Sequence, residues 1–181
     1  MQQRHHSMAP ELQMVESATC NYKYFELKTL TLCGKKHSEG VFMMRKISKY
    51  LFFWALGGAL YYTFEILFRG FSHWSMYVLG GICFVFFYIQ GESMGWQEPV
   101  WKQTLRCTVF VTAGEFITGI IVNKWLHYSV WDYSQMPLQV FGQICVPFMI
   151  IFSGLSVLGI FLSGYLAFYL YKEVKPSYHI L

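Results

Sequence analysis

Glu115 and Glu65 are the residues whose type and position most clearly predict a chemical role in this sequence. Glu115 stands in the middle of the apolar residues 108–122, and Glu65 stands near the end of an earlier apolar segment. An acidic side chain at the centre of a membrane helix costs about 2.5 to 3.5 kcal/mol on insertion scales, and it normally faces the protein interior. We therefore expect both carboxylates to face the inside of a helical bundle, with Glu115 as the first candidate for ligand contact.

Small and polar residues surround Glu115 at helical spacing. They recur at intervals of three and four positions, so they lie on one face of a helix. These residues are Thr108, Thr112, Glu115, Gly119 and Asn123. Lipid cannot satisfy polar groups, so this face predicts contact with the bundle or with a hydrated cleft. For Thr108, Thr112 and Gly119 the simpler interpretation is close helix packing.

Glu65 has a potential partner on its own helix. Arg69 follows it by four residues, and an acid placed before a base at this spacing is the better orientation for a helical pair. An exposed pair of this kind contributes only about 0.2 to 0.5 kcal/mol. The spacing is compatible with a pair that compensates itself and also with a carboxylate that faces a ligand.

Other polar candidates gather near one end of the apolar segments. Asp132 either caps a turn or contacts substrate. Pro147 cannot donate a hydrogen bond to residue 143, so it predicts a helix kink that exposes a carbonyl beside Gln143. His73 is an isolated histidine, and no metal ligation is predicted for it. The ligand-binding candidates are Glu65, Arg69, His73, Glu115, Asn123, Asp132 and Gln143.

The composition predicts a membrane protein. Aromatic residues make up 20% of the chain, charged residues make up only 13%, and the mean hydropathy is +0.35. Soluble domains carry about 25% charged residues. A chain of 181 residues has room for one small bundle of spans, but not for a nucleotide-hydrolysing domain beside it, and no Gly-x-x-x-x-Gly-Lys-Ser/Thr segment occurs. Energy for any transport would come from a separate ATPase subunit or from an ion gradient.

Charge and cysteine content exclude other classes of protein. The net charge is +4, but most basic residues precede the first apolar segment, where membrane topology and anionic lipid explain them without nucleic acid. The five cysteines include no Cys-x-x-Cys spacing, so neither a disulfide framework nor a zinc site is indicated. We expect no cofactor.

The apolar segments predict an all-α, polytopic membrane bundle of four spans arranged as two hairpins. The predicted spans cover residues 50–68, 74–90, 105–123 and 138–171. The fourth would be about 50 Å of helix against a hydrocarbon core of about 30 Å, so we expect it to be kinked or tilted. Residues 1–49 would form a basic N-terminal segment and residues 172–181 a tail.

The basic residues also predict an orientation. In a four-span arrangement only Arg69 and Lys124 of the 14 Lys and Arg residues lie on one side. Lys and Arg are enriched in cytoplasmic loops, so both termini are expected in the cytoplasm. Residues 1–49 contain no apolar run long enough for a cleavable signal peptide, so we expect the first span to remain as an anchor.

The two hairpins share a weak internal repeat, and together they resemble a known family. The repeat pairs Phe64-Glu65-Ile66 with Gly114-Glu115-Phe116, and Gly80-Gly81-Ile82-Cys83 with Gly142-Gln143-Ile144-Cys145. It predicts a site where the two halves meet.

Five segments in order carry the family resemblance: Phe64-Glu65-Ile66-Leu67-Phe68-Arg69-Gly70-Phe71-Ser72-His73-Trp74-Ser75-Met76, Gly80-Gly81-Ile82-Cys83, Glu115-Phe116-Ile117-Thr118-Gly119 with Asn123, Trp131-Asp132-Tyr133-Ser134, and Gly142-Gln143-Ile144-Cys145. Over residues 50–165 the chain resembles the ABC-transporter type IV, or CmpB-like, membrane family. The resemblance implies a multi-pass protein of the bacterial plasma membrane, similar to a transporter permease.

The leading hypothesis is therefore a permease-like protein that binds or passes a small solute through a polar pocket open toward the outer leaflet. One alternative is a membrane-embedded enzyme acting on lipid or isoprenoid headgroups, with Glu115 or Glu65 as base and His73 as acid. The sequence contains no recognisable catalytic motif, which favours a protein without enzymatic activity. Another alternative is a noncatalytic assembly subunit that associates through Ala55-x-x-x-Ala59.

Overall fold

The computed structural model describes residues 43–179. Most of the predicted basic N-terminal segment lies outside the described residues, as do the last two positions of the predicted tail. By its internal contacts the chain divides at residue 48, and the unit that carries the candidate site covers residues 49–181.

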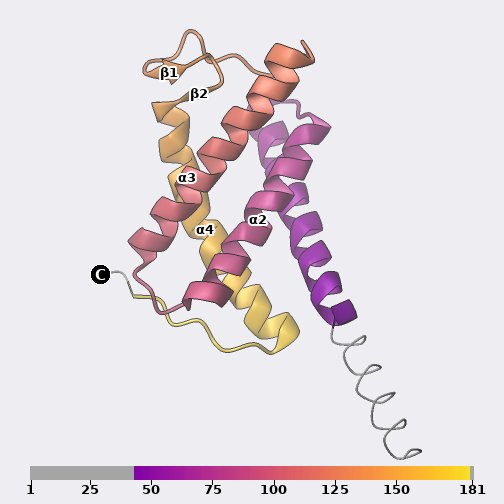
Figure 1. Cartoon of the computed structure of the whole chain (residues 1–181), viewed down its shortest axis with the longest axis vertical. Coiled ribbons are helices and arrows are strands. Elements are labelled where there is room, and N and C mark those ends of the chain that lie inside the picture. The colour runs from indigo at the N-terminus through magenta and orange to yellow at the C-terminus, as the bar shows by residue number, and fades with distance from the viewer. Residues whose placement is uncertain (1–42, 180–181) are drawn as a thin grey trace, which may run out of the picture. The chain divides into compact units, whose positions relative to one another are not determined.

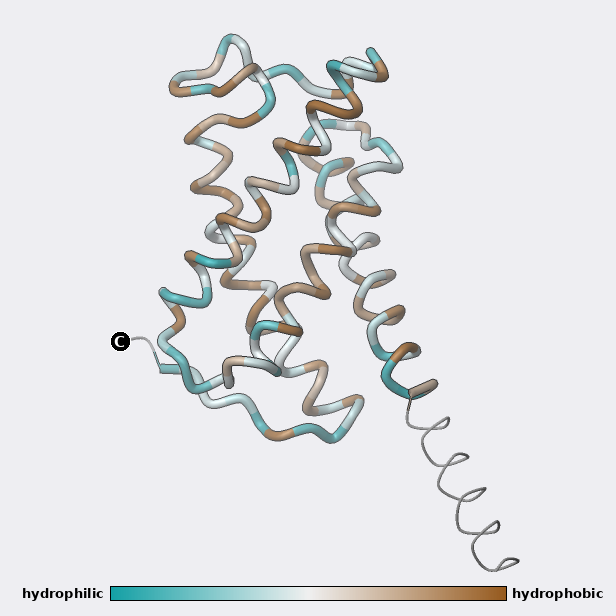
Figure 2. The backbone as a smooth tube through the Cα atoms, in the orientation of Figure 1, coloured by the Kyte–Doolittle hydropathy of each residue, from teal (hydrophilic) through white to brown (hydrophobic). Residues whose placement is uncertain are grey.

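Four helices are long and apolar enough to cross a membrane (Figure 1). They are a first helix at Met43–Arg69, α2 at Trp74–Met94, α3 at Val100–Gly119 with its π-helical extension η1 at Ile120–Trp125, and α4 at Val146–Tyr171. The shortest, α2, has 21 residues and is therefore about 32 Å long, enough for a hydrocarbon core of about 30 Å. The prediction of an all-α bundle with four spans is confirmed. Apolar residues dominate the helices in Figure 2, and hydrophilic residues collect in the connections and at helix ends.

A short hairpin replaces the first part of the predicted fourth span. Strands β1 (Gln139–Val140) and β2 (Ile144–Cys145) pair antiparallel. Leu138 and Phe141 have φ of 52°, and Gly142 has φ of 69°. These left-handed conformations are incompatible with a continuous α-helix. The prediction of a 34-residue fourth span beginning at 138 is therefore wrong at its N-terminal end.

Pro147 starts α4 and does not kink it. It occupies the first turn, where a missing N–H breaks no intrahelical hydrogen bond and the fixed φ of proline suits the helix. The 26 residues of α4 form about 39 Å of helix, so no kink is needed to fit the span to a bilayer. The predicted kink beside Gln143 is replaced by the turn between β1 and β2.

Glycines allow the first helix and α2 to lie very close together. A Cβ atom placed on Gly80 would lie 2.5 Å from the Cβ of Tyr61 and 3.2 Å from the carbonyl oxygen of Gly57. A Cβ atom placed on Gly58 would lie 2.5 Å from the carbonyl oxygen of Tyr77. Close approach through small residues is the usual way that membrane helices associate, and it fixes this pair as one wall of the bundle.

The bundle has two distinct ends. At the end that we call the loop end, residues 126–145 form the connection between η1 and α4 (Figure 1). At the opposite end, called the tail end, residues 172–179 run back across the helices, and Val100 N donates to His179 O at 2.8 Å. Lys49 Nζ contacts Glu173 Oε1 there at 2.6 Å. Within the bundle, α3 packs against both α2 and α4, which places Glu115 between them.

Candidate functional site

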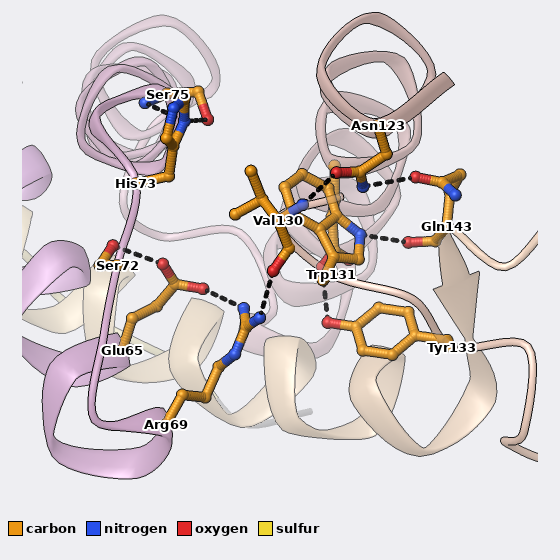
Figure 3. Close-up of polar contacts among 11 residues, drawn as sticks. Glu65, Arg69, Ser72, His73, Ser75, Asn123, Val130, Trp131, Tyr133 and Gln143 are labelled. Atoms are coloured by element: carbon orange, nitrogen blue, oxygen red, sulfur yellow. Dashed lines mark hydrogen bonds and ion pairs between the residues drawn. The ribbon is translucent and has the colours of Figure 1, made fainter. Parts of the chain in front are cut away.

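Both glutamates are buried inside the bundle, but their surroundings differ. The exposed fraction is 6% for Glu65 and 1% for Glu115. Glu65 is fully partnered: Arg69 Nη1 donates to Oε1 at 2.9 Å, and Ser72 Oγ donates to Oε2 at 2.6 Å (Figure 3). Arg69 Nη2 also donates to the carbonyl oxygen of Val130 at 2.8 Å, which ties the first helix to the loop end. The Glu65–Arg69 pair is therefore part of the scaffold.

A second hydrogen-bond network holds the connection before α4 in place. Asn123 Nδ2 donates to Gln143 Oε1 at 2.8 Å, while Asn123 Oδ1 accepts from Val130 N at 2.7 Å (Figure 3). Trp131 Nε1 donates to the carbonyl oxygen of Gln143 at 3.1 Å. Val130 thus uses its carbonyl for Arg69 and its amide for Asn123, so the two networks form one clamp around it.

Two predicted site residues have local structural roles. His73 is the N-cap of α2, where its Nδ1 accepts from Ser75 N at 3.3 Å. Asp132 is exposed and caps a turn by accepting from the backbone N of Ser134 at 2.9 Å and from its hydroxyl. Those two hydrogen bonds lower the pKa of Asp132 below its ordinary value of 3.8. Of the two interpretations of Asp132, the turn cap is the one that the structure shows.

Glu115 has a different environment from all of these residues. Tyr133 OH donates to Oε1 at 3.2 Å, and no donor among the described residues reaches Oε2. Burial of the Tyr133 side chain raises the pKa of its hydroxyl, so this hydroxyl remains a proton donor at neutral pH. An orphaned carboxyl oxygen in a buried position costs about 1 to 3 kcal/mol. Glu115 therefore has one oxygen that is held by Tyr133 and one that has no donor among the described residues.

A cavity of about 270 Å³ lies beside Glu115. All four helices line it, and its walls are largely apolar: Tyr61 and Phe64 from the first helix, Cys83 from α2, Val111 from α3, and Leu155 from α4 are among them. Glu115 and Ser156 add polar groups, and Ser156 Oγ has no partner in the part of the chain that the structure describes.

The cavity reaches the outer surface of the bundle between the first helix and α4. Leu60 on the first helix and Leu158 and Leu162 on α4 line the cavity, and all three are exposed. In a bilayer these three side chains would meet acyl chains. The arrangement differs from the predicted polar pocket, because Glu65, Arg69, Asn123 and Gln143 do not line this cavity.

Several residues that contact Glu115 or line its cavity were not among the predicted site residues. Tyr133 lies within the Trp131-Asp132-Tyr133-Ser134 segment, so its position in a family motif was the available signal. Cys83 lies within the Gly80-Gly81-Ile82-Cys83 segment, which gave the same kind of signal. Ser156 had no signal in the sequence, because the helix face that it shares with the cavity depends on the three-dimensional packing. Within residues 43–179 there is no group of three or more His, Cys, Asp or Glu side chains that could hold a metal ion.

Comparison with known protein families gives one match. The profile of the family described as "Putative ABC-transporter type IV" matches residues 58–180, which is more than half of the 181 residues. The match contains the whole set of predicted site residues. Neither the curated proteins nor the solved structures gave a match.

Proposed function

Because the chain belongs to the ABC-transporter type IV family, we propose that it is a transporter-type membrane component that binds a small amphipathic molecule in the cavity beside Glu115. The observation that carries the proposal is that Glu115 lines the cavity while its buried Oε2 has no hydrogen-bond donor within residues 43–179. A ligand with an apolar body and a donor headgroup would bury its body against the walls and satisfy this oxygen.

The dimensions of the cavity limit the ligand. At about 30 Å³ for a water molecule in the liquid, 270 Å³ corresponds to about nine water molecules. This is just below the usual size range of ligand pockets, about 300 to 1,000 Å³. A linear molecule of about ten non-hydrogen atoms would fit, and primary amines and alcohols are the donor headgroups that complement a carboxyl.

A separate partner would supply energy. The sequence has no nucleotide-binding motif, so coupling would require an ATPase subunit or an ion gradient. Small residues for a helix contact are available on the outside of the bundle, since Ala55 and Ala59 are exposed on the first helix and Gly154 is exposed on α4. Co-purification of a stoichiometric second membrane or ATPase protein would support this part of the proposal, and its absence under mild extraction would count against it.

Cys83 offers a direct test of ligand binding, because it lines the same cavity as Glu115. In a variant with Cys20, Cys33, Cys107 and Cys145 replaced by alanine, N-ethylmaleimide would report on Cys83 alone. We expect octylamine to slow the labelling of Cys83 in nanodiscs, and octanoate to have no such effect because its carboxylate offers no complementary donor. The same labelling rate with and without octylamine would refute the proposed site.

Two substitutions make the test specific for Glu115. Glu115→Gln should remove the protection by octylamine, because the amide presents no charge to an ammonium group. Asp132→Asn is the matched control: it changes an exposed carboxylate of the loop end and should leave the protection intact. Equal loss in both variants would show that protection does not depend on the Glu115 carboxyl.

We infer that the chain is not itself an enzyme. An acid–base pair of His73 with Glu115 or Glu65 would require the histidine at the site, whereas it caps α2 and does not line the cavity. Lipid analysis of a deletion strain separates the two hypotheses. Altered headgroup chemistry would favour the enzyme, and unchanged lipids with altered sensitivity to amphipathic amines would favour the transporter.

A further inference from the structure

Buried hydroxyl groups without hydrogen-bond partners follow one face of α3. The side-chain oxygens of Thr104, Thr108 and Thr112 lie one helical turn apart, and none of the three has a partner within residues 43–179. The next polar residue toward the loop end is Glu115, three residues further on and on the same helix face. The three threonines and Glu115 therefore form a continuous line, which we call the hydroxyl stripe.

The stripe is unusual because threonine in a membrane helix has a simple way to satisfy its hydroxyl. The hydroxyl can donate to the carbonyl oxygen one turn earlier in its own helix. The oxygens of the stripe have no such bond, although each is buried. Buried polar groups nearly always find a protein partner or an ordered water, so water molecules are the partners expected for these hydroxyls.

Both ends of the stripe reach polar groups. Toward the tail end, Gln103 is buried next to Thr104 and has an unpartnered Oε1 of its own, while its Nε2 donates to Glu98 O at 2.8 Å. Arg106 forms an ion pair with Glu98, and both side chains are about one third exposed, so this end reaches solvent. Toward the loop end, Glu115 accepts a hydrogen bond from Tyr133. From residue 103 to residue 115 the path is about 18 Å long.

We propose that the hydroxyl stripe is a proton path that connects Glu115 with the tail end of the bundle. A proton would pass along water molecules held by the threonine hydroxyls to the Glu115 carboxylate, which becomes a neutral carboxylic acid. It would leave toward the loop end when the carboxyl passes a proton to the Tyr133 oxygen while the Tyr133 hydroxyl releases its own. This goes beyond the binding of a solute, because it makes solute binding at Glu115 responsive to the proton gradient across the membrane.

The groups around Glu115 suit a proton better than a metal ion. Tyr61 of the first helix and Cys83 of α2 line the same cavity as Glu115, and Tyr133 of the connection before α4 donates to it, while Glu65 and Arg69 are paired with each other. A cation such as Ca²⁺ or Mg²⁺ needs six or more oxygen ligands or a retained shell of water, and this set offers one free carboxyl oxygen. A proton needs only that oxygen and a chain of hydroxyls.

The test measures proton entry into liposomes that contain the full chain and the trapped pH indicator pyranine, with potassium and valinomycin present to remove the membrane potential. After external acidification, the wild-type protein should acidify the lumen faster than protein-free liposomes do. The double variant Thr108→Val and Thr112→Val keeps the size of both side chains and removes both hydroxyls. We expect its rate to be about tenfold lower, which corresponds to about 1.4 kcal/mol. Glu115→Gln should lower the rate to that of protein-free liposomes.

Three controls keep the result interpretable. Thr63→Val changes an exposed threonine on the first helix and should leave the rate unchanged. The double variant Thr108→Ser and Thr112→Ser retains both hydroxyls and should restore the rate. Protection of Cys83 by octylamine should persist in the double valine variant, which shows that the fold and the cavity are intact. The proposal would be overturned if liposomes with the wild-type protein acidified no faster than protein-free liposomes. It would also be overturned if the double valine variant acidified the lumen as fast as the wild type.

Discussion

Replacement of Arg69 by methionine is the change whose cost follows most directly from the structure. Arg69 makes one bond to Glu65 Oε1 at 2.9 Å and another to Val130 O at 2.8 Å. Its side chain is 25% exposed, and that of Glu65 is 7% exposed. Loss of one partner from a buried pair costs about 3 to 5 kcal/mol, and the partial exposure of Arg69 favours the lower limit, about 3 kcal/mol.

A double-mutant cycle separates the charge interaction from the other losses. Glu65→Gln should cost about 1.5 kcal/mol, because it leaves a half-buried guanidinium that keeps its bond to Val130 and can reach water. The double variant with Arg69→Met removes both charges, so we expect it to cost about 2 kcal/mol, mainly from the orphaned Val130 carbonyl. The coupling free energy is then about 2.5 kcal/mol, within the range for residues in direct contact.

The measurement is equilibrium unfolding in mixed micelles, with dodecyl sulfate as the denaturant and circular dichroism as the signal. If the free-energy cost of the double variant equals the sum of the costs of the two single variants, the structural pairing is refuted. Protection of Cys83 by octylamine in the double variant serves as the functional control. Its retention is expected, because Glu65 and Arg69 do not line the cavity.

Three further predictions concern packing, the loop end and pH. Gly80→Val should prevent stable folding, because the first helix leaves no room for a side chain, whereas Gly154→Ala, which meets no atom within 4 Å, should leave the unfolding midpoint unchanged in the same assay. Asn123→Ala should cost about 2 kcal/mol and increase amide exchange in residues 126–145, since it orphans one partly buried donor and one buried acceptor; unchanged exchange would contradict the clamp. The carboxyl of Asp132 should titrate below 3.8, so its contribution to stability is present above that pH and is lost as the pH falls through the lower folded-state pKa; Ser134→Ala should move the midpoint seen by NMR back toward 3.8, and a midpoint that stays in place would exclude these hydrogen bonds as the cause.

The sequence was sufficient to predict the helical part of the fold because hydrophobic length is a local property. Four apolar segments predicted four spans, and the structure has helices at all four positions. The start of the fourth was missed, since the apolar residues 138–145 have the composition of a span. The left-handed backbone at Leu138, Phe141 and Gly142 prevents a helix over these residues. Of the three, only the glycine is a residue type that indicates a left-handed conformation from the sequence.

Prediction of the site was limited because the sequence does not show which buried polar residues have hydrogen-bond partners and which do not. Helical spacing placed Glu65 and Glu115 on inward faces, and both are buried. The spacing of Arg69 allowed a pair with Glu65, which forms. No pattern in the sequence could show that Asn123 and Gln143 satisfy each other, because they are 20 residues apart and meet only after the connection before α4 has folded back. The available carboxyl oxygen of Glu115 became apparent only after these partners were assigned.

The most direct test of the central claim is an experimental structure of the protein in nanodiscs with 8-bromooctylamine, whose bromine marks the apolar end of the ligand. We expect the bromine between the first helix and α4, and the amine nitrogen within hydrogen-bond distance of Glu115 Oε2, about 2.7 to 3.2 Å. A cavity without the ligand, or an amine bound at Glu65 or Asp132 with Glu115 Oε2 satisfied by a protein group, would contradict the account.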